Sequence, residues 1–231
     1  MSQITSPKVV EHYIKSQEKA VTSGKKYPNL MLVRSFSFLM ENGAKKILDY
    51  GCGGGLNTVF MLSRGADVCY ADTSPHALRL TSNNINQLDN INASHSPQII
   101  DKDATLLPFS DEEFDVIVCA SVMSLLSNLD NIKALLSEFS RVLKPDGKLY
   151  VDINGIESQF VYYSEKVGKN QFKYSGVDKK SNSIIAYCPQ SEEDFNNIVS
   201  TRFNILYSGF SQHDLINFKE HEYIVIGQNK N

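Results

Sequence analysis

The nine residues Ile47–Gly55, ILDYGCGGG, decide the fold. A short apolar run contains one acid, Asp49, and four glycines then fall within positions 51–55. Glycine loses more backbone entropy on folding than any other residue, so a cluster of glycines indicates a backbone that turns sharply or is approached closely. The stretch therefore predicts a buried strand that ends in a tight glycine turn, followed by a helix.

The composition excludes several broad classes of protein. The chain has 231 residues, of which 42% are hydrophobic, and this is enough to bury a core. A net charge of −3 provides no positive field that would recruit nucleic acid or an acidic membrane surface. No run of apolar residues is nearly as long as the roughly 18 residues that a membrane-spanning helix needs. The polar N-terminus also lacks the apolar core of a secretion signal.

The cysteines are widely spaced and include no C-x-x-C pair. There are four of them: Cys52, Cys69, Cys119 and Cys188. Cys69 and Cys119 lie in apolar runs typical of strands. We therefore expect buried, reduced thiols in a cytoplasmic protein, and no metal site.

Apolar strand patterns alternate with helical patterns along the middle of the chain. Strands are predicted at 45–50, 67–71, 97–101, 114–120 and 148–153. Helices are predicted at 56–63, from Ser74-Pro75 to about Leu88, and at 129–143. Because these strands are apolar throughout, the order predicts an α/β fold with a mostly parallel sheet that is covered by helices on both faces.

The two ends of the chain depart from this alternation. Residues 1–43 predict two helices, the second after Pro28-Asn29. A helix near 191–199 and strands near 202–207 and 221–228 are predicted at the other end, the two strands as an antiparallel hairpin at the sheet edge. We expect one domain over 1–231, made of a helical cap (1–43), a cofactor-binding core (44–153), a substrate-side insertion (154–190) and a C-terminal helix with strands (191–231).

Three kinds of ligand favour a glycine turn at the carboxyl end of a parallel strand. A P-loop requires a lysine that GCGGGLNT does not have. A dinucleotide fingerprint, G-x-G-x-x-G, fits Gly51 and Gly53 but meets Leu56 at its third glycine. The carboxylate of Asp49 would repel a pyrophosphate, but it would favour an ammonium or a sulfonium. The pattern therefore indicates a cofactor with a nucleoside at one end and positive charge at the other.

At this point the sequence resembles the class I, seven-stranded S-adenosylmethionine-dependent methyltransferases. Five segments between Lys45 and Ile153 carry the resemblance in chain order: LDYGCGGG (48–55), YADTSPHAL (70–78), KDATLLPF (102–109), FDVIVCASVMSLL (114–126) and RVLKPDGKLYV (141–151). The resemblance implies a Rossmann-like sheet of seven strands and S-adenosyl-L-methionine as the cofactor.

The resemblance also assigns cofactor-binding residues. It implies that Asp72 binds the ribose hydroxyls and that Asp103 and Ala104 contact the adenine edge. Asp72 lies 21 positions past Gly51 at the end of a predicted strand, where an acid can accept hydrogen bonds from two hydroxyls. The other expected contacts are Asp49, Gly51, Cys52, Gly53, Thr73, Ala120 and Tyr27.

Each assignment has a structural alternative. Asp72 could serve as a cap of the following helix, and Asp103 could form a turn. Tyr27 could be a core tyrosine instead of a residue that folds over the cofactor. We interpret Cys52 as a small filler and not as a nucleophile.

No general base is evident from the sequence. Methyl transfer from a sulfonium is an in-line displacement, in which alignment and desolvation supply most of the acceleration. The weak catalytic candidates are His213, Tyr162 and Tyr163. The N-P-P-[YF] segment of many amino-group methyltransferases is replaced here by CASVM, which disfavours that chemistry.

Residues 154–190 combine aromatic side chains with lysines, and we expect them to form a lid over a small-molecule acceptor. The lysines, Lys166, Lys169, Lys173, Lys179 and Lys180, favour an anionic acceptor, or they form a solvated face. No membrane or nucleic-acid partner is expected. Two other functions stay open: a catalytically silent domain that binds S-adenosylmethionine to control a partner, and a nicotinamide-dependent oxidoreductase.

Overall fold

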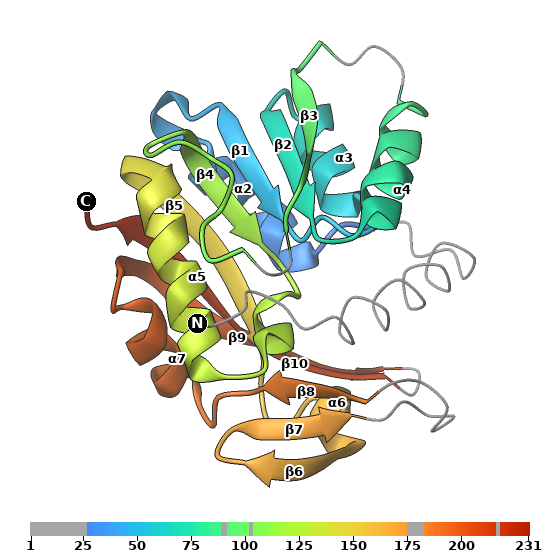
Figure 1. Cartoon of the computed structure of the whole chain (residues 1–231), viewed down its shortest axis with the longest axis vertical. Helices are drawn as coiled ribbons and strands as arrows, with labels where there is room; N and C mark the ends of the chain where they lie inside the picture. The colour runs from blue at the N-terminus through green and yellow to red at the C-terminus, as the bar shows by residue number, and fades with distance from the viewer. Residues whose placement is uncertain (1–26, 89–91, 102–103, 175–182, 216–217) are drawn as a thin grey trace.

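A computed structural model describes residues 27–88, 92–101, 104–174, 183–215 and 218–231 (Figure 1). The first of the two expected N-terminal helices lies outside these residues. Asp103, expected at the adenine edge, also lies outside them, as do Lys179 and Lys180. Within the described part of the chain, no helix is both long and apolar enough to cross a membrane.

The main sheet has seven strands in the order β3-β2-β1-β4-β5-β10-β9. Five are parallel neighbours: β3 (His95–Ile99), β2 (Asp67–Asp72), β1 (Lys46–Tyr50), β4 (Phe114–Cys119) and β5 (Leu143–Asn154). Two close the sheet as an antiparallel hairpin: β10 (Phe218–Asn229) and β9 (Phe203–Leu215). The predicted fold class, a mostly parallel seven-stranded sheet with a C-terminal edge hairpin, is confirmed.

Helices cover both faces of this sheet, as the alternation of elements predicts. Figure 1 shows α5 (Leu129–Val142) in front of the sheet and α2 (Leu30–Leu39) and α3 (Leu56–Ser63) behind it. The helix α7 (Glu192–Val199) packs into the same hydrophobic core as α5, and α4 (Pro75–Ile85) lies beside α3. The face of α5 toward the sheet buries Ile132, Leu135, Leu136 and Phe139 completely, which accounts for the helical spacing of its apolar residues.

Local capping fixes where the helices near the glycine turn begin. Ser74 caps α4 by accepting a hydrogen bond from the Ala77 amide, and Pro75 occupies the first helical position. Asn29 caps α2 by accepting hydrogen bonds from the amides of Met31 and Leu32. The helix α3 begins after Gly55, whose backbone is left-handed at φ +78°.

Several strands differ in extent from their predictions. β9 and β10 are 13 and 12 residues long because they pair with each other along almost their whole length, past the end of β5. β5 begins at Leu143 because this residue already pairs with Phe114 of β4. β3 begins at His95, two residues earlier than predicted, where it pairs with Val68 of β2.

Residues 154–190 form structure that was not predicted in detail. A short helix, α6 (Gln159–Tyr162), precedes an antiparallel sheet of β6 (Ser164–Gly168), β7 (Gln171–Tyr174) and β8 (Ile184–Tyr187). The small core of this second sheet is built on Phe172, Ala186 and Cys188. Figure 1 shows it beyond the carboxyl ends of β1 and β4. There Gln171 Nε2 donates to the carbonyl of Ser127, just after the 3-10 helix η2 (Met123–Leu126) that follows β4.

Candidate functional site

The glycine turn folds back from β1 onto the end of β2. Gly51, Gly53 and Gly55 all have positive φ, at +74°, +54° and +78°. The amides of Gly51 and Cys52 both donate to the carbonyl of Ala71, at 2.7 and 3.0 Å. Non-glycine residues rarely adopt such dihedrals, so the three glycines permit a turn that other residues would strain.

Packing inside the protein already excludes side chains at two of these positions. A Cβ added to Gly51 would lie 2.3 Å from Cγ2 of Val122. A Cβ added to Gly55 would lie 2.7 Å from the side chain of Thr81. The groups that come close to the backbone at these two glycines are therefore other residues of the protein, Val122 and Thr81.

The amides of the turn are also largely used within the protein. Gly51 and Cys52 donate to Ala71, Gly53 donates to Asp72, and Gly55 donates to the carbonyl of Cys52. These four amides therefore stabilise the turn itself. The α4 helix secures the turn further, because Thr81 Oγ1 donates to the carbonyl of Gly53.

Asp72 joins the end of β2 to the glycine turn. Its side chain is buried, with 8% of its surface exposed. Oδ2 accepts a hydrogen bond from the Gly53 amide at 3.0 Å, and Oδ1 accepts one from the Ser74 amide at 2.9 Å. Because a carboxylate offers about four acceptor positions, Asp72 retains acceptor capacity for a further donor. The side-chain cap of α4 is Ser74, so the structure does not give Asp72 that alternative role.

The environment of Asp72 sets its ionisation. Burial raises the pKa of Asp72, and the hydrogen bonds from the amides of Ser74, Gly53 and Thr73 oppose that rise. A hydrogen-bond donor or a positive charge brought to the remaining acceptor positions would favour the ionised form.

Asp49 is a second buried carboxylate beside the turn, with 1% of its surface exposed. Thr58, in the first turn of α3, donates its hydroxyl to Oδ2. Burial raises the pKa of Asp49 to about 7; the Thr58 hydroxyl lowers it, and the charge of Asp72 raises it further. A buried carboxylate with this balance ionises more readily when a cation lies close to it.

Cys52 is buried against α4, and Thr81 Oγ1 lies 3.5 Å from its sulfur. Burial, together with the charges of Asp49 and Asp72, raises the pKa of the Cys52 thiol well above its ordinary value. Since the thiolate is the reactive form of cysteine, this raised pKa keeps Cys52 in the unreactive thiol form.

A polar network beside the turn was not foreseen from the sequence. Asp152 of β5 is completely buried, and its carboxylate accepts hydrogen bonds from the Ser121 amide and from Asn29 Nδ2. The Tyr150 hydroxyl donates to Asn29 Oδ1 at 3.1 Å, and the Asn29 amide donates to Asn57 Oδ1 at 2.9 Å. Asn29 thus connects the start of α2 with β5 and with the first turn of α3.

Burial raises the pKa of Asp152 to about 7, against the lowering effects of the Ser121 and Asn29 hydrogen bonds. One signal in the sequence could have identified it: Asp152 is a lone acid inside the apolar run LYVDI, and a charge in a buried strand requires partners. Its partner Asn29 is 123 positions away, so the pair itself could not be predicted.

The tyrosine between Asp49 and Gly51 is also buried. The side chain of Tyr50 is 3% exposed, and its ring meets that of Phe139 edge-to-face at 5.1 Å. Its hydroxyl is buried and has no hydrogen-bond partner among the residues that the structure describes.

Two other expected cofactor residues lie at the edge of this cluster. Ala120 is buried directly after β4, and Thr73 is partly buried directly after β2. Ala104 is partly buried, and its amide donates to the carbonyl of Asp101 at 3.0 Å. Tyr27 is 85% exposed, so the alternative of a core tyrosine is wrong.

The catalytic candidates are all exposed. His213 lies on β9, with Nε2 3.3 Å from a carboxylate oxygen of Glu220. Tyr162 and Tyr163 are 77% and 56% exposed, and their rings meet edge-to-face at 5.0 Å. None of the three shares a described hydrogen bond with the residues around the glycine turn.

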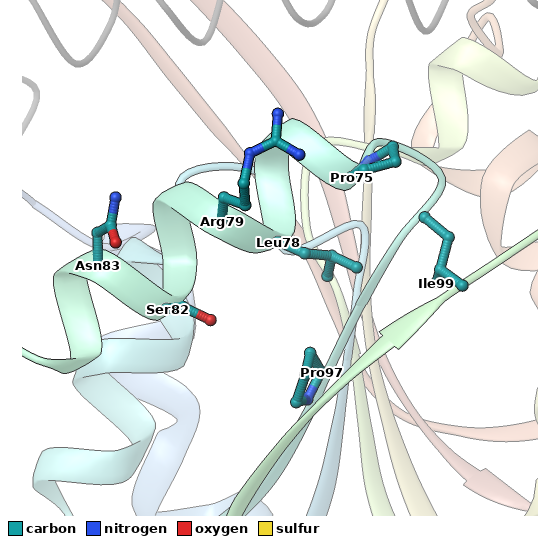
Figure 2. Close-up of a pocket in the computed structure, with 7 residues that line it drawn as sticks. All are labelled: Pro75, Leu78, Arg79, Ser82, Asn83, Pro97 and Ile99. Atoms are coloured by element: carbon teal, nitrogen blue, oxygen red, sulfur yellow. The ribbon is translucent and has the colours of Figure 1, made fainter.

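A surface groove of about 560 Å³ lies elsewhere, between α4 and β3. Figure 2 shows the residues that line it: Pro75, Leu78, Arg79, Ser82, Asn83, Pro97 and Ile99. None of the expected cofactor residues belongs to this set, so the groove is separate from the carboxylates at the glycine turn.

Comparison with known proteins agrees with this geometry. Residues 48–151 match a family described as "Methyltransferase domain". The demethylmenaquinone methyltransferase of Tropheryma whipplei is 35% identical over 107 residues, which are 46% of this chain and 41% of that protein. The match thus spans about two fifths of that relative. The ubiquinone biosynthesis O-methyltransferase of Glaesserella parasuis is 27% identical over 194 residues, 80% of this chain and 79% of that protein.

Solved structures share the fold. An S-adenosylmethionine-dependent methyltransferase from Methanosarcina mazei superposes with a TM-score of 0.67 at 20% identity, over 88% of this chain and 98% of that one. The magnesium protoporphyrin IX methyltransferase of Synechocystis PCC 6803, solved with S-adenosylhomocysteine bound, gives 0.66 at 14% identity, over 96% and 98%. The matched family, the named relatives and the strand order all agree with the class I S-adenosylmethionine-dependent methyltransferases that the sequence resembles.

Proposed function

We propose that this protein transfers a methyl group from S-adenosylmethionine to a small-molecule acceptor. The observation that carries the proposal is Asp72. It is a buried carboxylate at the end of β2 that holds the glycine turn through Gly53 and retains acceptor capacity beyond its amide hydrogen bonds. A carboxylate at this place in the fold suits the hydroxyls of a ribose.

The residues around the turn fit S-adenosylmethionine as a ligand. Asp72 would hold its ribose, and Asp49, whose pKa burial raises to about 7, would be stabilised by the positive charge of its methionine end. When bound, the cofactor supplies a methyl group that is already activated for displacement. Ala104, Thr73 and Ala120 flank the same carboxyl edge of the sheet and would shape the rest of the pocket.

The chain itself then has to orient the acceptor and exclude water. The Ser121 amide donates to Asp152, which fixes the loop after β4, and the second sheet meets that loop where Gln171 donates to Ser127. These contacts support a role for residues 154–190 as a lid over the acceptor. Tyr162 and Tyr163 present exposed aromatic surface on that segment, and this surface suits a flat acceptor.

The class of acceptor rests on two further observations. The relatives are named for demethylmenaquinone, for ubiquinone biosynthesis and for magnesium protoporphyrin IX, which supports a small organic acceptor. Lys166 on β6 and Lys169 in the turn between β6 and β7 are exposed and would favour an acceptor that carries negative charge. Exposed charges more than about 8 Å from the acceptor would contribute little at physiological salt, because they are screened.

Incubation with S-adenosylmethionine labelled in the methyl group, together with fractionated cell extract, tests the proposal. We expect the label to appear in a small organic product that mass spectrometry can identify. Binding of S-adenosylmethionine without turnover on any fraction, joined with a stable protein complex, would contradict the proposal in favour of a regulatory domain. Binding of a nicotinamide dinucleotide in its place would favour an oxidoreductase.

A further inference from the structure

We propose that the hydroxyl of Tyr50 is a further cofactor-binding group, which donates a hydrogen bond to the adenosine part of bound S-adenosylmethionine. This inference rests on the proposed function. The sequence assigns no role to Tyr50, although this residue lies between Asp49 and Gly51 in the glycine-rich stretch.

Tyr50 differs from the other buried tyrosines of the described chain. Each of the others has a hydrogen-bond partner: Tyr70 with Ser82, Tyr150 with Asn29, Tyr187 with Asn170, and Tyr223 with the carbonyl of Gln190. The Tyr50 hydroxyl is equally buried, yet it has no partner among the described residues. A buried polar group without a partner is costly, so such groups are rare and usually meet a water or a ligand.

The position of the ring indicates which ligand. Tyr50 ends β1, directly before the glycine turn, and its backbone pairs with Ala71, the residue before Asp72. Its ring packs on Phe139 of α5, which places it on the α5 face of the sheet. Leu107 and the partly buried Ala104 belong to the same apolar cluster. The ring therefore shares the α5 face of the sheet with Ala104, which belongs to the segment expected at the adenine edge, and Tyr50 lies close enough to Asp72 to be influenced by its charge.

The chemistry of the hydroxyl makes it a donor. Burial raises the pKa of Tyr50 well above its ordinary value, and the neighbouring Cys119 and Asp72 raise it further, so the phenol stays protonated. Cys119 is itself a buried thiol and only a weak hydrogen-bond acceptor. The oxygen and ring-nitrogen atoms of a nucleoside are much better acceptors, and no group in the described part of the chain supplies one to this hydroxyl.

The substitution Tyr50→Phe removes only the hydroxyl and tests the inference directly. The variant should bind S-adenosylmethionine about three- to tenfold more weakly than the wild type, as expected for one hydrogen bond. It should bind 5′-methylthioadenosine more weakly by a similar factor, because both ligands carry the nucleoside. The urea midpoint of the ligand-free variant should equal or exceed that of the wild type, since a costly unpaired group has been removed.

Tyr70→Phe is the matched control. Its hydroxyl has a partner, Ser82 Oγ at 2.8 Å, so this variant should lower the urea midpoint and leave the affinity for S-adenosylmethionine unchanged. Equal affinity of Tyr50→Phe and the wild type for both ligands would overturn the inference, as would a lowered midpoint of ligand-free Tyr50→Phe. A wild-type protein that binds no S-adenosylmethionine would overturn the proposed function itself.

Discussion

The carboxylate of Asp72 accepts a hydrogen bond from the amide of Gly53 across 3.0 Å, so the end of β2 is tied to the turn that follows β1. This contact positions a buried acid and a left-handed glycine as one unit. Any ligand that binds the free acceptor positions of Asp72 therefore lies against the glycine turn. The affinity of the protein for its cofactor is expected to depend on this unit.

Gly51→Ala should destabilise the fold by about 2–4 kcal/mol, because strain at positive φ adds to a steric clash. The added Cβ would lie 2.3 Å from Val122, at φ +74°. Gly43→Ala is the matched control, since Gly43 has φ +79° but open space around it, and it should cost about 1 kcal/mol. Urea unfolding measures both variants. Equal losses would mean that Val122 yields readily to a new side chain.

Asp49 should make the stability of the ligand-free protein depend on pH. The pKa of this carboxyl is at its ordinary value of 3.8 in the unfolded chain and is raised to about 7 in the folded protein. The folded state then binds more protons between these values, so stability should fall as pH rises from about 4 to about 7. Unfolding of the wild type and of Asp49→Asn at several pH values tests this.

The Asn variant should show a shallower decline in stability across that range. Asp152, which also has a pKa raised to about 7, should account for part of the decline that remains. Identical slopes in the wild type and Asp49→Asn would show that Asp49 is ionised at neutral pH in the folded protein.

Asp152→Ala should destabilise the protein by about 2–4 kcal/mol, because it leaves the Ser121 amide and the Asn29 side chain without their acceptor. Asp115→Ala is the control. Asp115 also accepts hydrogen bonds from two amides, those of Lys45 and Lys46. Its side chain is partly exposed, so water can accept these hydrogen bonds when the carboxylate is removed. We expect its loss to cost about 1 kcal/mol. Similar urea midpoints for the two variants would argue against a special role for the buried network.

Replacing both Tyr162 and Tyr163 by alanine should impair methyl transfer far more than cofactor binding. Both side chains are largely exposed, so the fold should lose little stability. Tyr207→Ala, which removes another exposed aromatic side chain, should leave turnover unchanged. The measurements are turnover on the identified acceptor and the affinity for S-adenosylmethionine. Full turnover by the double variant would exclude the proposed lid and make the N-terminal helices the leading candidate for acceptor binding.

Local signals account for the parts of the fold that could be predicted. The helix at 56–63 was predicted with its observed bounds, because the glycine turn marks its start and an apolar stripe marks its extent. The start of α4 followed from Ser74-Pro75, which combines a cap with a first-turn proline. The strands β6 and β7 were missed because their apolar residues are few. All three strands of the second sheet, β8 included, are short and are stabilised by mutual pairing and by packing around Phe172.

In the candidate site, too, some features could be predicted from the sequence and others could not. The proximity of Asp72 to the glycine turn could be inferred, because the carboxyl ends of neighbouring parallel strands meet at one edge. The Asp152–Asn29 pair joins residues far apart in the chain, and neither belongs to a periodic pattern. The missing partner of Tyr50 could not be inferred either, because it depends on how five buried tyrosines are packed.

Calorimetric titration with S-adenosylmethionine tests the central claim most directly. The wild type should bind one equivalent with micromolar affinity, and Asp72→Ala should weaken binding by about 1.5–3 kcal/mol, the range for a hydrogen bond to a charged group. Asp67→Ala is the control, since Asp67 lies at the opposite end of β2 and accepts only the Ser94 amide among the described hydrogen bonds. No binding by the wild type, or unchanged affinity in a folded Asp72→Ala variant, would contradict the account.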